Sequence, residues 1–267
     1  MKILVPIDFS QDAEKALEYA ITLAQRKSGE IELIHVIELV YDFASQAALA
    51  LDGMHQDANR ILGELVTKYS GSGVEMSYAI KEGTASITAA KYAQEIDAKL
   101  IVMGTKGASG LMKFAMGSTT VSLLKESEVP VLVVPREANL TQIKGLTLAL
   151  EFSDHEKKFV DWVVDISQNW DMELSFLHIQ HSPSFKDELA CFGLNAFLEK
   201  NFSGKNFKCI TRKAESPSAG LNAYLEDQPN TILVVCHEHK NFWNQLTKRS
   251  ESIDLAYTAK TPVLVLI

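Results

Sequence analysis

The sequence predicts an α/β protein in which helices cover both faces of parallel sheets, and three observations support this class. Short apolar runs alternate with amphipathic stretches of helical period, which is the pattern of parallel strands joined by helical crossovers. Runs such as residues 3–5 and 131–134 are apolar at every position, so both faces of their sheets should be covered. The two halves of the chain also resemble one another, which indicates a tandem architecture.

The predicted elements can be placed in order. In the first half, we expect strands near residues 2–7, 31–36, 74–80, 99–104 and 130–134, and helices near 12–27, 46–69, 84–97 and 117–126. Ser10, ahead of Asp12, is the expected cap of the first helix. In the second half, we expect strands near 145–151, 173–179, 206–212, 231–236 and 262–266, with helices between them.

The internal repeat divides the chain. Residues 31–36 align with 174–179, and residues 100–103 align with 232–235 at a spacing about eleven residues shorter. Because a solenoid repeat would recur every few tens of residues, this long period indicates tandem domains. The polar segment 136–144 lacks periodicity and is the predicted junction. The domains are therefore predicted at 1–138 and 144–267.

Composition limits the class of function. The chain has 267 residues, 46% of them hydrophobic and 22% charged, which is enough for two cores of roughly 130 residues each. A net charge of −8 argues against a nucleic-acid partner, which would need clustered Lys and Arg. No stretch approaches the ~18 apolar residues of a membrane span, and the start lacks the layout of a signal peptide, so we expect a cytoplasmic protein without a membrane partner.

The cysteines predict no disulfide framework. Cys191, Cys209 and Cys236 are odd in number and lack CxxC spacing. In the cytoplasm, thiols are also kept reduced. We therefore expect free cysteines.

A glycine pattern, Gly104-x2-Gly107-x9-Gly117-Ser118, occurs once, between a predicted buried strand and a predicted helix. Glycine lets the backbone approach a ligand closely, and the first amides of a helix favour anions. Ser118 and Thr119 would add hydroxyls and amides there. Alternatively, Gly104 and Gly107 only make a turn, and Gly117 only allows close packing.

Asp8 and Val36 end the first and second predicted strands. Ligands of open parallel sheets bind beyond the carboxyl ends of the strands. If the first and fourth strands are neighbours, Asp8 would face the glycine crevice and could accept hydrogen bonds from a ribose, and Val36 would offer backbone groups to a base. A role of Asp8 as a helix-cap carboxylate stays open.

Four segments closely resemble the universal stress protein family: residues 5–10, residues 33–36, the glycine pattern and residues 130–135. The resemblance covers both halves. It implies two doubly wound domains, each with a five-stranded parallel sheet in the order 3-2-1-4-5, that pair through their last strands. In the ATP-binding branch it implies that Asp8 and Val36 contact the nucleoside. The residues that would hold the phosphates are Gly104, Gly107, Gly117, Ser118 and Thr119.

The second half lacks this pattern. An alignment without gaps places Cys236 opposite Gly104, His239 opposite Gly107 and Arg249 opposite Gly117, while Glu151 replaces Asp8. Bulky side chains would fill the phosphate space, so the second domain is not expected to bind ATP in the family manner.

The histidines of the second half leave a metal hypothesis open. Cys236, His237 and His239 are residue types that suit zinc. Their spacing matches no standard zinc motif, and a degenerate structural copy is the leading interpretation. His178 repeats His35 and is expected to be a core histidine.

No catalytic residue is assigned, because the chain lacks a GxxxxGK[ST] loop, a GxSxG elbow, an HExxH pair and the kinase signatures. The leading hypothesis is a stress-response sensor or regulator that binds ATP or ADP in its first domain, with magnesium or manganese accompanying a triphosphate, and that acts on an unknown protein partner. A slow ATP hydrolase or nucleotidyl-transfer enzyme remains the enzymatic alternative. A nucleotide-independent scaffold with a metal or hydrophobic-ligand site is a third, and association into a homodimer stays open.

Overall fold

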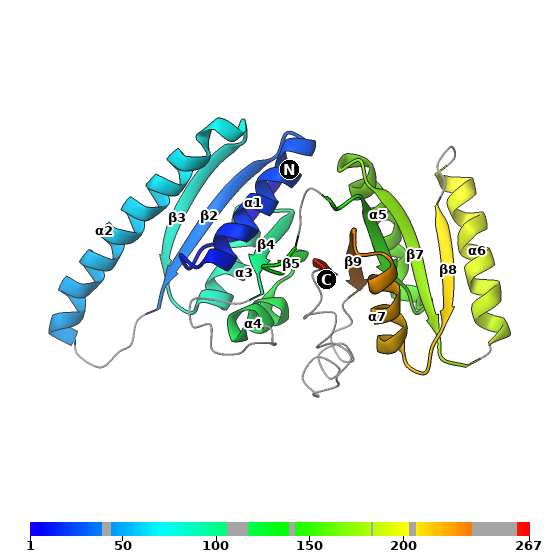
Figure 1. Cartoon of the computed structure of the whole chain (residues 1–267). Helices are drawn as coiled ribbons and strands as arrows, with labels where there is room; N and C mark the ends of the chain where they lie inside the picture. The colour runs from blue at the N-terminus through cyan, green and yellow to red at the C-terminus, as the bar shows by residue number, and fades with distance from the viewer. Residues whose placement is uncertain (39–43, 106–116, 139–141, 183, 203–206, 237–260) are drawn as a thin grey trace. The chain divides into compact units, whose positions relative to one another are not determined.

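The computed structural model describes residues 1–38, 44–105, 117–138, 142–182, 184–202, 207–236 and 261–267. These residues form two compact units, Met1–Arg136 and Glu137–Ile267. Each unit is an α/β structure built on a parallel sheet (Figure 1).

The first unit contains a parallel sheet in the order β3-β2-β1-β4-β5. Its strands are β1 (Lys2–Pro6), β2 (Glu30–Ile37), β3 (Glu75–Glu82), β4 (Leu100–Gly104) and β5 (Val131–Val134). Its helices are α1 (Gln11–Arg26), α2 (Ala44–Tyr69), α3 (Ala85–Glu95) and α4 (Ser118–Glu126). The predicted order 3-2-1-4-5 is confirmed, and the predicted elements agree with these bounds to within a few residues.

The second unit has the same topology. Its parallel sheet has the order β8-β7-β6-β9-β10. The strands are β6 (Gly145–Ala149), β7 (Glu173–Gln180), β8 (Lys208–Lys213), β9 (Thr231–Cys236) and β10 (Val263–Leu266). The helices are α5 (Lys157–Asn169), α6 (Phe185–Asn201) and α7 (Pro217–Asp227).

The strand registers reproduce the internal repeat. Lys2 pairs with Glu30 in the first unit, as Gly145 pairs with Glu173 in the second. Gly104 likewise pairs with Val134, as Cys236 pairs with Leu266. Equivalent residues of these strands therefore occupy equivalent places, and the alignment made from the sequence is confirmed for the strands.

Burial follows the apolar pattern. Every residue of β4 and β5 is buried, as expected of strands covered on both faces. The α1 helix begins as predicted, because the Ser10 hydroxyl accepts a hydrogen bond from the Ala13 amide at 3.1 Å. None of the helices in the described ranges is long and apolar enough to cross a membrane.

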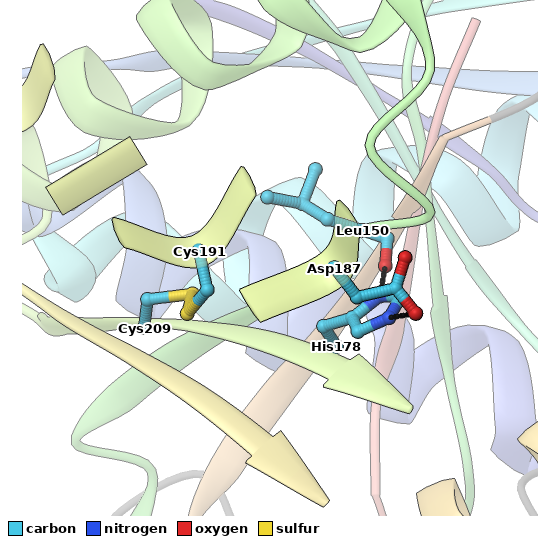
Figure 2. Close-up of a disulfide and its surroundings, with 5 residues drawn as sticks. All are labelled: Leu150, His178, Asp187, Cys191 and Cys209. Atoms are coloured by element: carbon cyan, nitrogen blue, oxygen red, sulfur yellow. Dashed lines mark hydrogen bonds and ion pairs between the residues drawn. A yellow bond between two sulfur atoms is a disulfide. The ribbon is translucent and has the colours of Figure 1, made fainter. Parts of the chain in front are cut away.

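The expectation of free cysteines was wrong for two of the three. Cys191 of α6 and Cys209 of β8 form a disulfide, with their Cα atoms 6.1 Å apart (Figure 2). The packing of α6 against β8 brings the two residues together, and no cysteine spacing motif signals such a contact. Cys236 is a free thiol.

Candidate functional site

A pocket with a volume of about 380 Å³ opens in the first unit where β1, β2 and β4 end. Among the predicted site residues, Asp8, Val36, Gly104 and Thr119 line it. Volumes of this size are typical of small-molecule sites. Residues from separate strands and from the start of α4 thus meet at one cavity, beyond the carboxyl ends of the strands.

Asp8 is oriented by the turn between β1 and α1. Its Oδ1 atom accepts a hydrogen bond from the Ser10 amide at 3.0 Å. Phe9, between them, has a left-handed φ of 62°. Because Ser10 caps the helix, the Asp8 carboxylate is held in a turn at the pocket wall.

Gly104 is glycine because of packing. A Cβ atom there would lie 2.8 Å from the Asp12 carbonyl oxygen and 2.9 Å from the Asp12 carbonyl carbon. The φ of Gly104 is not in the left-handed region. Its carbonyl accepts a hydrogen bond from the Thr120 hydroxyl at 3.2 Å, which fixes the end of β4 to the first turn of α4. Close packing against α1 therefore requires glycine at this position, where the alternative interpretation expected only a turn.

Thr105 and Gly117, the described residues on either side of segment 106–116, lie next to one another. The Gly117 amide donates a hydrogen bond to the Thr105 carbonyl at 2.7 Å. The segment itself, with Gly107 and Lys106, is outside the described residues.

The first amides of α4 have no intrahelical hydrogen-bond partner. Gly117 is its N-cap and supplies no side-chain hydrogen bond. The first intrahelical bond runs from the Val121 amide to the Gly117 carbonyl at 3.1 Å, so the amides of Ser118, Thr119 and Thr120 precede it. The side chains of Ser118 and Thr119 are exposed, and Thr119 lines the pocket, whereas Gly117 and Ser118 lie next to it in the chain without lining it. This helix end can attract an anion.

Other lining residues were missed by sequence reasoning. Glu38 follows β2, and its carboxylate accepts a hydrogen bond from the Ala85 amide of α3 at 2.8 Å. Met54 and Met103 supply apolar surface to the same pocket. The one sequence signal for Glu38 was its place two positions after Val36, just after the end of the same strand. The methionines gave no signal, because they fit ordinary helix and strand patterns.

His35 belongs to the fold of this turn. Its Nδ1 atom lies 2.7 Å from the Ile7 carbonyl oxygen, and its ring stacks on Phe9 with centroids 4.3 Å apart. His178 repeats both contacts. Its Nδ1 atom lies 2.9 Å from the Leu150 carbonyl oxygen, and its ring centroid lies 4.7 Å from that of Phe152. His178 is buried, and its Nε2 atom lies 3.4 Å from an Asp187 carboxylate oxygen (Figure 2). The prediction of a core histidine is confirmed.

The second unit replaces the site chemistry. Cys236 stands where Gly104 stands, and burial, reinforced by the nearby Glu156 charge, raises the pKa of its thiol. The buried Glu156 carboxylate accepts hydrogen bonds from the Ser153 and Glu151 amides, each at 2.9 Å. It thus takes over the hydrogen bond that Asp8 accepts in the first unit.

Several predicted positions of the second unit are outside the described residues. They are His237, His239 and Arg249. Within the described part of the chain, no group of three or more His, Cys, Asp or Glu residues is arranged to hold a metal ion.

Comparisons with known sequences identify relatives of the chain. The sequence model of the Universal stress protein family matches residues 1–135. Universal stress protein MJ0577 of Methanocaldococcus jannaschii is 29% identical over 154 residues, which cover 51% of this chain and 95% of that protein. Universal stress protein YxiE of Bacillus subtilis is 29% identical over 144 residues, which cover 50% and 97%.

Similarity to a solved structure extends over the whole chain. The crystal structure of a universal stress protein from Archaeoglobus fulgidus has a TM-score of 0.80 at 22% identity, covering 99% of this chain and 97% of that one. This likeness concerns the fold, including its tandem arrangement.

Proposed function

The chain belongs to the universal stress protein family, and from that premise we propose that its first unit binds ATP or ADP in the pocket at the ends of β1, β2 and β4. The observation that carries the proposal is the meeting of Asp8, Val36, Gly104 and Thr119 around one cavity of about 380 Å³. The family resemblance predicts that these four residues contact a nucleotide, and their meeting at one pocket is an observation that the prediction did not use.

Each wall of the pocket suits one part of a nucleotide. The Asp8 carboxylate would accept hydrogen bonds from the ribose hydroxyls, and the backbone of Val36 would face the base, with Met54 and Met103 as apolar neighbours. The uncapped start of α4 would hold the phosphates. Gly104, Gly107, Gly117, Ser118 and Thr119 are the proposed phosphate residues, and magnesium or manganese would accompany a triphosphate.

We assign the second unit a structural role. Cys236 replaces Gly104, and Glu156 turns its carboxylate to the local backbone. We further propose a cytoplasmic stress regulator in which nucleotide occupancy alters the surface offered to a protein partner, and in which the two units pair through their last strands. Slow ATP hydrolysis would be compatible with this function, and so would a nucleotidyl-transfer activity.

Calorimetric titration with ATP and ADP tests the proposal. The variant Gly117→Arg, which copies the residue aligned in the second half, should weaken binding at least about tenfold, because the side chain would occupy the helix end that holds phosphate. Gly53→Arg is the matched control, since nothing lies within 4 Å of a Cβ atom at Gly53. Absence of binding to the unaltered chain, or equal affinity in Gly117→Arg, would contradict the assignment.

A further inference from the structure

Helix α6 has an apolar stripe on its outer face. Phe185, Leu189 and Phe192 are 75%, 54% and 76% exposed, and their spacing of i, i+4 and i+7 places them in one row. Ala196, also exposed, continues the row. The opposite side of the helix is turned to the unit, where Leu198 is buried. We call Phe185, Leu189, Phe192 and Ala196 the outer stripe.

The fold does not require an apolar surface here. The corresponding helix of the first unit, α2, exposes Asp57, Arg60 and Glu64. Arg60 forms ion pairs with Asp57 at 3.6 Å and with Glu64 at 3.0 Å, as an ordinary solvated helix face does. The two copies share a topology, so the outer stripe is a property of α6 itself.

The helix is also anchored in place. The Cys191–Cys209 disulfide joins it to β8 (Figure 2). The Ser184 hydroxyl caps its start by accepting a hydrogen bond from the Asp187 amide at 3.3 Å. An anchored helix loses little conformational entropy when a partner covers it.

The size of the stripe suits self-association. A buried aromatic side chain contributes about 150–250 Å², so the stripe offers on the order of 400 Å² of apolar surface in each chain. Two such stripes together, with their polar flanks, approach the roughly 1,000 Å² that a specific interface needs. The helix has two lysines against three carboxylates, in a chain of net charge −8, which disfavours an anionic membrane as the partner.

We propose that the outer stripe pairs with the same stripe of a second copy of this chain, with the two α6 helices parallel about a twofold axis. In that arrangement, Phe192 would fill a hole formed by Leu189, Phe192, Gly193 and Ala196 of the second copy. Gly193 is exposed, and no atom lies within 4 Å of a Cβ atom added there. This leaves room for the Phe192 ring of the other copy.

The flanking charges select the parallel orientation. At 3.6 residues per turn, Lys186 and Lys200 lie along one side of the stripe, and Glu188 and Glu199 lie toward the other; all four are exposed. A parallel twofold pair places the basic side of each helix beside the acidic side of the other, whereas an antiparallel pair would place like charges together.

The mass of the full chain in sedimentation velocity, over a wide concentration range, tests the proposal. The unaltered chain should change from 29.6 kDa to twice that mass as concentration rises. Phe192→Glu should weaken association at least about tenfold, because a charge would enter the centre of the interface. Ile87→Glu, at a 39% exposed position of α3, is the matched control and should leave the association unchanged.

Charge exchange tests the orientation. Glu188→Lys with Glu199→Lys, and Lys186→Glu with Lys200→Glu, should each weaken association, and the four changes combined should restore it. A chain of 29.6 kDa at every concentration, or a dimer insensitive to Phe192→Glu, would overturn the proposal. So would single-flank exchanges without effect, or a chain that stays monomeric and binds anionic vesicles through the stripe.

Discussion

At the residue scale, two glycines of the first unit have opposite surroundings. Gly104 ends β4 against the backbone of Asp12. A Cβ atom added to Gly104 would lie 2.8 Å from the Asp12 carbonyl oxygen. Gly53 lies inside α2 with nothing within 4 Å. The first is constrained by tertiary contact, and the second only lowers helix propensity.

Alanine substitution separates these two cases. We expect Gly104→Ala to lower the free energy of unfolding by about 1–3 kcal/mol, because the added methyl group must displace the backbone of α1. Gly53→Ala should raise it by about 0.5–1 kcal/mol. Urea unfolding followed by circular dichroism measures both. A neutral Gly104→Ala would show that β4 and α1 adjust freely.

At the element scale, α6 differs from its counterpart α2 in how it is attached. Contacts of α2 with α1 include an ion pair between Lys68 and Glu14 and a hydrogen bond from the Tyr69 hydroxyl to Glu14 at 3.0 Å. The attachment of α6 includes the Cys191–Cys209 disulfide. A covalent link constrains the unfolded chain as well, which a surface ion pair does not.

Removing this link should loosen the second unit. For a sequence separation of 18 residues, the chain-entropy relation gives a loss of about 3 kcal/mol when Cys191 and Cys209 are both replaced by serine. Urea unfolding with and without a dithiol reductant should show the same decrease in the unaltered chain. Cys236→Ser, which leaves the disulfide intact, is the control. Identical transitions in oxidised and reduced protein would contradict this expectation.

At the scale of the whole molecule, one topology is used twice with different chemistry at the strand ends. The first unit has a pocket lined by Asp8 and Gly104, and the second has Glu156 and Cys236 at the related places. A ligand that binds one unit should therefore stabilise the two unequally.

Hydrogen exchange with and without ATP measures this difference. At a ligand concentration of 100 times Kd, the linked stabilisation is about 2.7 kcal/mol, and we expect slower exchange in β1, β4 and the start of α4. Amides of β6, β9 and α5 should change little. Equal protection of both units, or protection of the second unit alone, would contradict the proposed site.

Much of the fold could be predicted because its signals are local. The period of the hydrophobic residues predicted the strands and helices. The Ser10 cap is also a local signal, because its hydroxyl accepts a hydrogen bond from the amide of Ala13, only three residues away. Of the residues predicted to form a site, Asp8, Val36, Gly104 and Thr119 line one pocket, while the lining residues Glu38 and Met54 were not foreseen. Their position depends on how β2 and α2 pack, which no local pattern encodes.

By itself, the sequence determined the element types, the tandem repeat and the residues that end each strand, since these depend on periodicity and on neighbours along the chain. Only the tertiary structure decided which distant groups meet: Glu38 with Ala85, Gly104 with Asp12, and Cys191 with Cys209. It also decided that the apolar stripe of α6 faces outward. The physical reason is that contacts and burial depend on the packing of segments far apart in sequence. A local sequence pattern is compatible with several such packings, so it does not select one of them.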